Sequence, residues 1–398
     1  MRDTGGDLHT ALTAARDRLR HWLLRESLPL WTSAGVDPAT GGFRESLDRR
    51  TGAPTAAPTR PRVPPRQIYA VLTGAALGWQ GPAEALALRA LADYHRRFRV
   101  ADGTLRPEPV VAGGVRPCDL YDQAFALFAY AALAEAVPAK RPAMEAEAAH
   151  LLATLRERLR HPAGGFQEDA PPRLPLRANP HMHLFEAALA WEAVTEDAAW
   201  PALADEIAGL ALARFIDAET GALREFFAAD WTPMPDETGR IVEPGHQFEW
   251  AWLLRRWGLK RDRQDALAAA RRLFAIGCAH GICPQRKMAV LSLTDDFAVL
   301  DPVARLWSQT EWLKASLAMG EIAETAAERA ACRRQALDAV AALERFLDTE
   351  TPGTFAGAWH DRLGPDGTFV DEPAPASSFY HIVCAISELD AVLARGGV

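Results

Sequence analysis

The chain has 398 residues, of which 49% are hydrophobic and 24% charged, and its formal net charge is −8 at pH 7. Such a chain is long enough to bury a large core, and its composition is typical of a soluble globular protein. The negative charge and the scattered arginines, densest at Arg60, Arg62 and Arg66, argue against the basic stripe that binds nucleic acids or anionic membranes.

Residues 1–24 are polar and amphipathic and lack the apolar centre of a secretory signal. No run of about 18 apolar residues occurs, so we expect no membrane span. The cysteines are odd in number and no two have the CxxC spacing, which argues against a disulfide framework and a zinc knuckle. We therefore expect a cytoplasmic protein with reduced thiols.

Apolar residues recur with the period of an amphipathic helix along most of the chain. Clear examples are residues 119–136, 183–194 and 310–347. The alternation typical of strands is nearly absent. The sequence therefore predicts an all-α fold.

A short loop recurs between the helices, and each copy is marked by a glycine followed by an apolar or bulky residue. These glycines are separated by 61, 62, 56, 60 and 72 residues: Gly42, Gly103, Gly165, Gly221, Gly281 and Gly353. Glycine supplies backbone conformations that other residues resist at the end of a helix. A nearly constant period indicates a repeat architecture. We expect six helical hairpins closed into an (α/α)6 barrel, a single catalytic domain over residues 1–398.

The second helix of each hairpin begins with polar or aromatic residues. These starts lie near Arg66, Asp119, Asn179, Pro244, Trp307 and Ser377. If these helices form the inner ring, their N-termini gather at one mouth of the barrel. Backbone N–H groups and helix dipoles there favour negative charge, which suits an anionic intermediate.

Four of the eleven histidines fall in these helix starts: His181, His183, His246 and His381. The pKa of an imidazole, about 6.5, lets it act as base or acid near neutral pH. His246 and His381 occupy equivalent places in different repeats. We therefore predict that they form a pair for proton transfer, as removal of the carbon 2 proton of a sugar aldehyde requires.

Neighbouring polar residues admit both a functional and a structural interpretation. Glu249 lies three residues after His246 and shares its helix face, where it either orients the imidazole or is a solvated helix residue. Trp307, Gln309 and Glu311 offer the aromatic plate, amide and carboxylate of a sugar site, or are core and surface residues.

The pair His181 and His183 has a spacing that points two helix side chains in different directions, so both rarely bind one ion. No HExxH pattern supports zinc either. We expect no metal, and we expect His183 to face the cavity while the other histidine packs.

Several segments together resemble the N-acylglucosamine 2-epimerase family. They occur in the family's order over nearly the whole chain: GVDPATGGFRESLD, RQIYA, LYDQAFALFAY, NPHMHLFEA, EPGHQFEWAWLL, LWSQTE and FYHI. The resemblance implies the same barrel, a sugar substrate and no cofactor. It implies that His246 and His381 are the acid–base pair, and that Arg66 holds the sugar oxygens and stabilises an enediolate.

The resemblance also implies substrate contacts elsewhere in the matching motifs. They comprise Tyr121, Asn179, His183 and Glu249, together with Trp307, Gln309 and Glu311 of the W-x-Q-T-E motif. We predict that these seven residues surround the sugar.

Two departures from the family pattern bear on the substrate. Pro64 and Pro65 precede Arg66, where many members carry Q-x-R-Q. PASSFYH stands where the epimerases often have a Lys-x-x-Trp-Lys run, and in this it resembles the mannose isomerase branch. We therefore predict an aldose–ketose isomerase for a free monosaccharide pair such as D-mannose and D-fructose, acting through an enediol or enediolate.

Other functions remain open at this point. A sugar 2-epimerase would use the same two histidines. A glycoside hydrolase on such a barrel would need two carboxylates, for which Glu225, Glu243 and Asp301 are available. An inactive sugar-binding or protein-binding module is a further alternative. A phosphorylated or sulfonated sugar and an oligomer are both compatible with the sequence, since Arg60, Arg62 or Arg240 can reach an anion.

Overall fold

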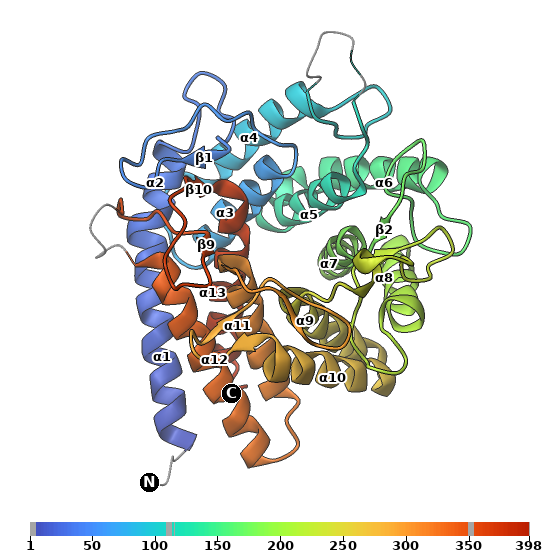
Figure 1. Ribbon diagram of the computed structural model, residues 1–398. Helices are drawn as coiled ribbons and strands as arrows, with labels where there is room; N and C mark the ends of the chain where they lie inside the picture. Colours follow the sequence, from blue (N-terminus) through green and yellow to red (C-terminus); the bar gives the residue numbers. More distant parts are fainter. Residues whose placement is uncertain (1–4, 109–113, 115, 349–353, 398) are drawn as a thin grey trace.

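The computed structural model describes residues 5–108, 114, 116–348 and 354–397, and its long helices form two concentric rings (Figure 1). The inner ring comprises α3 (Val63–Ala76), α5 (Leu120–Ala136), α7 (Ala178–Val194), α9 (Pro244–Arg261), α11 (Leu306–Glu321) and α13 (Phe379–Ala394). Each inner helix packs against the next, and α13 closes the ring against α3. The outer ring comprises α1 (Gly5–Trp22), α4 (Ala83–Phe98), α6 (Arg141–Arg158), α8 (Ala199–Leu210), α10 (Gln264–His280) and α12 (Ala326–Leu347). The predicted all-α (α/α)6 barrel is confirmed.

Short helical turns extend or connect these helices. The outer helices α1 and α8 continue into π-helical turns. The short elements are η1 (Leu23–Ser27), α2 (Leu28–Ser33), η2 (Pro138–Lys140), η3 (Ala211–Phe215), η4 (Glu237–Arg240) and η5 (Ala376–Ser378). The last of these leads directly into α13, so the final inner helix effectively begins at residue 376.

Small antiparallel ribbons lie beside the starts of the inner helices. They are β1 (Ser46–Leu47) with β10 (Ala374–Pro375), β2 (Leu176–Arg177) with β3 (Phe226–Phe227), β4 (Ile282–Cys283) with β5 (Met288–Ala289), β6 (Ser292–Leu293) with β7 (Val299–Asp301), and β8 (Ala304–Arg305) with β9 (Arg362–Leu363). Strands β2, β8 and β10 immediately precede α7, α11 and η5. The β1–β10 pair links the first repeat to the last, so backbone hydrogen bonds help to close the ring of repeats at this end of the barrel.

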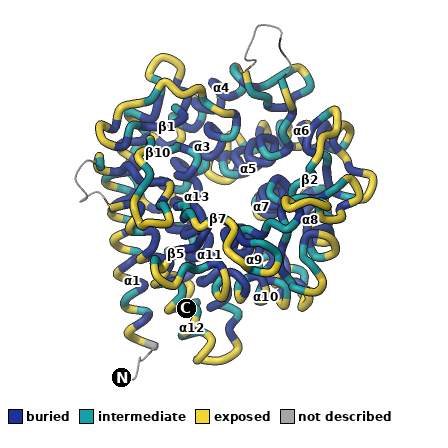
Figure 2. The backbone as a smooth tube through the Cα atoms, in the orientation of Figure 1, coloured by how far each residue is buried: buried dark blue, intermediate teal, exposed yellow. Residues whose placement is uncertain are grey.

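The inner helices are buried on nearly every side because each packs against two neighbours and an outer helix (Figure 2). Residues 122–131 of α5 and 306–320 of α11 are all buried. A helix buried all round carries little amphipathic pattern. Polar residues inside such runs therefore need partners within the protein.

The repeated loop glycine adopts the left-handed backbone conformation in four repeats, at Gly41, Gly103, Gly165 and Gly221. A backbone bridge spans each of these loops: Val36 with Phe43, Arg99 with Leu105, Arg160 with Phe166, and Ile216 with Leu223. In the first loop the left-handed residue is therefore Gly41 and not Gly42. Gly281 is a helix cap with φ −86°, so the fifth copy differs, and Gly353 lies outside the described residues.

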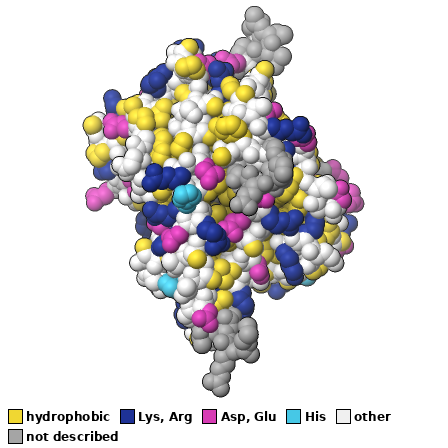
Figure 3. Space-filling view, turned by 90° about the vertical axis from the view of Figure 1, so that its left-hand side faces the viewer, with side chains coloured by type: hydrophobic (Ala, Val, Ile, Leu, Met, Phe, Trp, Pro, Cys, Tyr) yellow, Lys and Arg dark blue, Asp and Glu magenta, His cyan; other side chains and the backbone are white. Residues whose placement is uncertain are grey.

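One segment, Ala376–Ala394, is long and apolar enough to cross a membrane by length and composition, and 72% of it is buried inside the protein. It forms η5 and α13 of the inner ring. A buried core helix meets the same criteria of length and composition. On the face shown in Figure 3, basic and acidic side chains are interspersed rather than gathered into a stripe.

Candidate active site

The inner helices begin around a cavity of about 380 Å³. Eight of the ten predicted site residues line it: Arg66, Tyr121, Asn179, His183, His246, Glu249, Trp307 and His381. The remaining lining residues are Arg60, Arg62, Glu243, Leu291, Arg305, Ser377 and Ser378. Residues from all six repeats thus meet at one mouth of the barrel.

Repeat symmetry explains why so many polar groups meet here. His183, Glu249 and Glu311 are each the sixth residue of their inner helix, and His381 is the sixth counted from the start of η5. Side chains at the same position of neighbouring inner helices lie at the same level along the barrel axis. A buried ring of titratable side chains results, and all four are less than one tenth exposed.

His246, near the start of α9, lies among carboxylates. Its Nδ1 is 2.9 Å from Glu225 Oε2 and 3.4 Å from Glu243 Oε2. Its Nε2 is 3.3 Å from the side-chain amide nitrogen of Asn179. Burial alone would lower the pKa of His246, but the charges of Glu225, Glu243 and Glu249 raise it to about 10. The imidazole is therefore protonated at neutral pH and can act as an acid.

His381, on α13, has the opposite electrostatic environment. Its Nδ1 is 2.9 Å from Glu311 Oε1, a contact in which the carboxylate accepts and Nδ1 carries the proton. Burial lowers the pKa of His381 well below its ordinary value, and the positive charges of Arg66 and Lys314 lower it further. This imidazole is therefore neutral, with the lone pair on Nε2 available as a base.

Trp307 connects the two histidines. The centroid of its ring lies 5.0 Å from that of His246 and 5.8 Å from that of His381. The imidazoles come from residues far apart in the sequence but share one aromatic neighbour beside one cavity. They are placed where both can reach the same small molecule.

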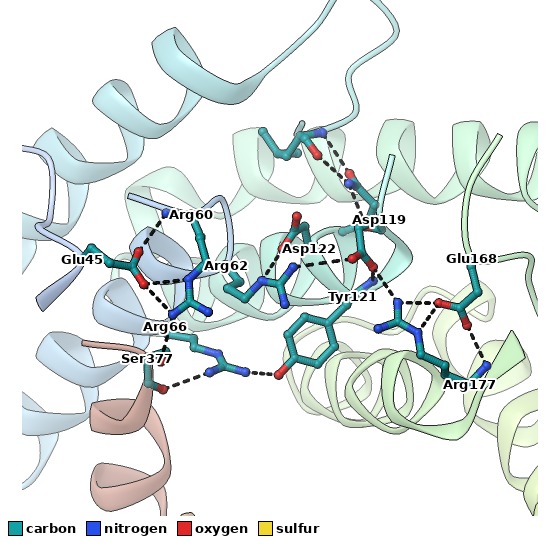
Figure 4. Close-up of polar contacts among 12 residues, drawn as sticks. Glu45, Arg60, Arg62, Arg66, Asp119, Tyr121, Asp122, Glu168, Arg177 and Ser377 are labelled. Carbon is teal, nitrogen blue, oxygen red and sulfur yellow. Dashed lines mark hydrogen bonds and ion pairs between the residues drawn. The ribbon is translucent and has the colours of Figure 1, made fainter. Parts of the chain in front are cut away.

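Arg66 is held rigidly at the wall of the cavity (Figure 4). Its Nη1 donates to the backbone oxygen of Ser377 at 2.9 Å, and its Nη2 donates to the Tyr121 hydroxyl. The guanidinium also lies 4.0 Å from the centroid of the Phe125 ring. These contacts fix a positive charge at the cavity, where it can stabilise a developing oxyanion.

Glu249 and His183 lie at the inner end of the site. Burial and the neighbouring Glu311 raise the pKa of Glu249 well above its ordinary value, and neither of its oxygens has a hydrogen-bond partner among the described residues. Burial lowers the pKa of His183 to about 3, and its Nδ1 lies 3.4 Å from Glu186 Oε2. Tyr380 donates its hydroxyl to the same oxygen. Glu249 thus has free hydrogen-bonding capacity toward the cavity that it lines.

Two buried groups in this layer have the residue types of a metal site. His183, Glu186 and Glu249 form one, and Glu249, Glu311 and His381 form the other, each with its ligand atoms within 4.8 Å of one another. Lys314 Nζ lies 2.6 Å from Glu311 Oε2. The second group therefore already has a positive charge, the Lys314 ammonium, beside one of its carboxylates. That the reaction needs no metal stays a prediction.

The family profile of N-acylglucosamine 2-epimerase (GlcNAc 2-epimerase) matches residues 41–385. The chain belongs to this family. The mannose-6-phosphate isomerase of Rhizobium meliloti (strain 1021) is 49% identical over 381 residues, which are 95% of this chain and 97% of the relative. As an N-acylglucosamine 2-epimerase family member, the protein is a sugar isomerase or epimerase that acts on a small-molecule sugar, and the predicted resemblance is confirmed.

Solved structures of other proteins have the same barrel fold as this chain. A crystal structure of D-mannose isomerase has a TM-score of 0.82 at 18% identity and covers 96% of this chain and 97% of its own. The cellobiose 2-epimerase from Spirochaeta thermophila DSM 6192 has a TM-score of 0.80 at 20% identity, covering 96% and 98%. At these identities the likeness concerns the fold.

Gln309 lies away from the cavity, contrary to the prediction that it contacts the sugar. It is fully buried, and its side chain accepts from the Ala289 N–H and donates to the Ala289 C=O. Gln123 and Gln247 bind the backbone of Leu105 and Leu223 in the same way. The glutamine amide therefore fixes an interhelical loop in each of these three repeats.

His181 occupies the same helix position as these glutamines. Its Nε2 accepts from the Phe166 N–H at 3.0 Å, and its Nδ1 donates to the Arg177 C=O at 2.9 Å. Glu311 also differs from prediction, because it does not line the cavity and instead contacts His381. His181 packs and His183 lines the cavity, as the sequence analysis expected.

Glu225 was expected from the sequence only as one of the carboxylates of a hydrolase. In the structure it contacts His246. Glu45 and Glu168 end the corresponding loops of other repeats and bind Arg60 and Arg177. Aligning the loop glutamates across repeats would have identified Glu225 as a partner of the next inner helix.

Proposed function

We propose that this protein is an aldose–ketose isomerase for a sugar pair with the configuration of D-mannose and D-fructose. The observation that carries the proposal is that two imidazoles line one cavity in opposite surroundings, His246 beside the carboxylates of Glu225 and Glu243 and His381 among positive charges. Environments that push two pKa values apart assign an acid and a base. The name of the mannose-6-phosphate isomerase, which is 49% identical over 95% of the chain, supports the same reaction type.

The two histidines divide the proton transfers. After ring opening, His381 Nε2 removes the proton from carbon 2 while His246 protonates the carbonyl oxygen of carbon 1, which gives the enediol. His246, now neutral, accepts the proton of the oxygen on carbon 2, and His381 delivers its proton to carbon 1. The ketose forms, and both histidines return to their starting protonation states.

Arg66 and Glu249 complete the site in this proposal. The Arg66 guanidinium is already oriented by Tyr121 and the Ser377 backbone, so it stabilises negative charge on the sugar oxygens without reorganising. Glu249 lines the cavity and its oxygens have no hydrogen-bond partner among the described residues, so its carboxyl group binds a sugar oxygen. Asn179 and Trp307 bind the rest of the sugar.

A 2-epimerase is the second candidate, and the family to which the chain belongs favours it. Epimerisation uses the same enediol but returns the proton to carbon 2 from the opposite face. Both imidazoles contact Trp307, which keeps either ring within reach of the same carbon. The products distinguish the reactions, because the isomerase forms a ketose and the epimerase forms an aldose.

A phosphate on the sugar is favoured by three arginines at the cavity. Arg60, Arg62 and Arg305 line it, while the carboxylates that hold them, Glu45, Asp122 and Asp361, do not. These anchored guanidiniums retain Nη1 groups that make no hydrogen bond within the described residues. Arg240, the other arginine considered from sequence, binds Asp295 and Asp296 and does not line the cavity. The relative named for mannose 6-phosphate agrees with this form of the substrate.

Proton NMR in heavy water tests the reaction directly. The wild-type enzyme is given D-mannose, mannose 6-phosphate, D-glucose, cellobiose and N-acetylglucosamine in separate samples. We expect a ketose, in which carbon 1 carries deuterium to the extent that His381 exchanges its proton with the solvent before delivering it, and an epimeric aldose without ketose would contradict the isomerase proposal. His246→Asn and His381→Asn should each lose at least about 10²-fold in kcat, whereas His21→Asn on the surface should retain wild-type turnover.

A further inference from the structure

Lys314 is a fully buried lysine in the centre of the barrel. It is the ninth residue of α11, one turn beyond Glu311, and its side chain has no exposed surface. Its Nζ lies 2.6 Å from Glu311 Oε2 and 3.9 Å from the centroid of the Trp252 ring. A lysine is almost never fully buried unless it is paired, because an unpaired ammonium loses its hydration without compensation. The position therefore calls for an explanation beyond packing.

Titratable groups face this ammonium from four inner helices. They are Glu186 of α7, Glu249 of α9, Glu311 of α11 and Cys384 of α13. Burial lowers the pKa of Lys314, but these groups raise it above its ordinary value. Lys314 is therefore positively charged over the whole working range of pH. It supplies the cation for a cluster of buried carboxylates that would otherwise repel one another.

Glu311 connects Lys314 to the cavity. One of its oxygens, Oε2, meets the ammonium, and the other, Oε1, accepts from His381 Nδ1 at 2.9 Å. The ion pair at one oxygen and the hydrogen bond at the other hold the carboxylate against the imidazole. The tautomer of a histidine is set by the hydrogen bond that its other nitrogen makes.

We propose that Lys314 is a positioning residue for the reaction: it fixes the Glu311 carboxylate against His381 Nδ1, which presents the unprotonated Nε2 of His381 to the sugar. This inference rests on the proposed function, in which His381 is the base. Lys314 itself does not line the cavity and acts only through Glu311 and His381. In catalytic triads the base is oriented by a further side chain. Here Glu311 orients His381, and Lys314 in turn holds Glu311.

The charge of Lys314 also predicts a change in pH dependence. The charged groups that act on His381 are Arg66, Arg305, Lys314, Glu186 and Glu311. Lys314 lowers the pKa of His381, so its replacement by methionine raises that pKa and protonates the base more readily. Activity that requires neutral His381 is then lost at a higher pH. The acidic limb of the kcat profile should move to higher pH in Lys314→Met, which a purely structural role would not produce.

The first test replaces a lysine with methionine at two positions, one buried and one exposed. Lys314→Met removes the ammonium and keeps an unbranched side chain, and we expect kcat on the sugar to fall by about 10²-fold with a smaller change in KM. Lys260→Met removes a lysine that pairs with Glu192 at 2.9 Å and is 48% exposed, and it should leave kcat and the pH profile unchanged. Lys314→Arg, which keeps the charge, should retain more activity than Lys314→Met.

A double-mutant cycle separates this role from a loss of stability. If Lys314 acts through Glu311, Lys314→Met should lower kcat little further once Glu311→Gln is present. The double variant removes the charge of both partners, so we expect it to be more stable than Lys314→Met alone, in which Glu311 is left as a buried charge without its cation. Thermal unfolding is measured for each variant. Nitrogen-15 spectra of the imidazoles should show His381 with the proton on Nδ1 in the wild type and a mixture of tautomers in both single variants.

Three results would overturn the inference. They are wild-type kcat in folded Lys314→Met, an unmoved acidic limb, or fully additive losses in the cycle. The proposed function fails separately, because it is rejected by normal turnover in His381→Asn or by an aldose product. A dead His381→Asn enzyme beside a fully active Lys314→Met enzyme would reject the role of Lys314 alone.

Discussion

Glu225 Oε2 lies 2.9 Å from Nδ1 of His246, although the glutamate ends one interhelical loop and the histidine begins the following inner helix. Both side chains are less than one tenth exposed. A buried carboxylate at this distance favours the charged imidazole. The pair supports the roles that we propose, with His246 as the acid and His381, which contacts Glu311 but is also close to Arg66 and Lys314, as the base.

Replacing Glu225 with glutamine should shift the alkaline limb of the pH–rate profile to lower pH. Activity that requires protonated His246 is lost as the pH rises through its pKa of about 10. Without the Glu225 charge we expect that pKa to fall by about 1 to 3 units. The measurement is kcat between pH 6 and 11. Glu237→Gln, at a side chain that is 87% exposed, is the control, and an unmoved alkaline limb in Glu225→Gln would reject the assignment.

Arg66→Lys should lower kcat by about 10²- to 10³-fold, the cost typical of losing a donor to a developing oxyanion. Lysine keeps the charge but cannot donate to the Ser377 backbone and the Tyr121 hydroxyl from one rigid plane. The expected loss is in kcat more than in KM, because the interaction strengthens in the transition state. Steady-state kinetics of Arg66→Lys and of Arg44→Lys, at an arginine that pairs with Asp37 and does not line the cavity, provide the comparison. Equal kinetics for the two variants would contradict the role given to Arg66.

His181→Gln should make the protein less sensitive to acid. Burial lowers the pKa of His181 to about 4, below the value of about 6.5 in an unfolded chain. The unfolded state therefore takes up the proton first, and stability is present above pH 6.5 and lost as the pH falls toward 4. That loss reaches about 3 kcal/mol for a shift of this size. Glutamine holds the equivalent loop in three other repeats without titrating.

The check is the free energy of unfolding in urea at pH 7 and at pH 4.5. The variant should match the wild type within about 1 kcal/mol at pH 7 and exceed it at pH 4.5. His21→Gln, on the exposed face of α1, serves as the control and should change neither value. A variant that loses as much stability as the wild type on acidification would show that His181 does not contribute to the loss.

The sequence predicted the barrel and most of the cavity because both repeat. The glycine loops and the polar helix starts recur with nearly constant spacing, so the N-termini of the inner helices could be assigned to one mouth. His246 and His381 were identified because they stand in those starts. The spacing could not show which way each side chain points. Gln309 and Trp307 lie in one short motif, yet one side chain binds the Ala289 backbone and the other lines the cavity.

Contacts between repeats were also beyond the sequence. Lys314 reads as an ordinary helix lysine, one turn from Glu311, until the structure places its ammonium against Trp252 of α9. Glu225 was considered only as a carboxylate, because its partner comes from the next helix. Pairings across repeats depend on the radius of the ring and the level of each residue along the axis, which a linear pattern does not encode.

Arg305→Gln should lower the preference for a phosphorylated sugar. Arg305 is held by Asp361 through Nε and Nη2, which leaves Nη1 at the cavity for a phosphate oxygen. Loss of one charge-assisted hydrogen bond should reduce the ratio of kcat/KM for mannose 6-phosphate to that for D-mannose by about 10- to 100-fold. The ratio is the proper quantity, because Arg305 also lowers the pKa of His381 and that effect applies to both sugars. Arg240→Gln, which removes an arginine bound to Asp295 outside the cavity, should leave the ratio unchanged. If both variants keep the wild-type ratio, or if the wild type prefers free mannose, the arginines do not bind a phosphate and the substrate is the free monosaccharide.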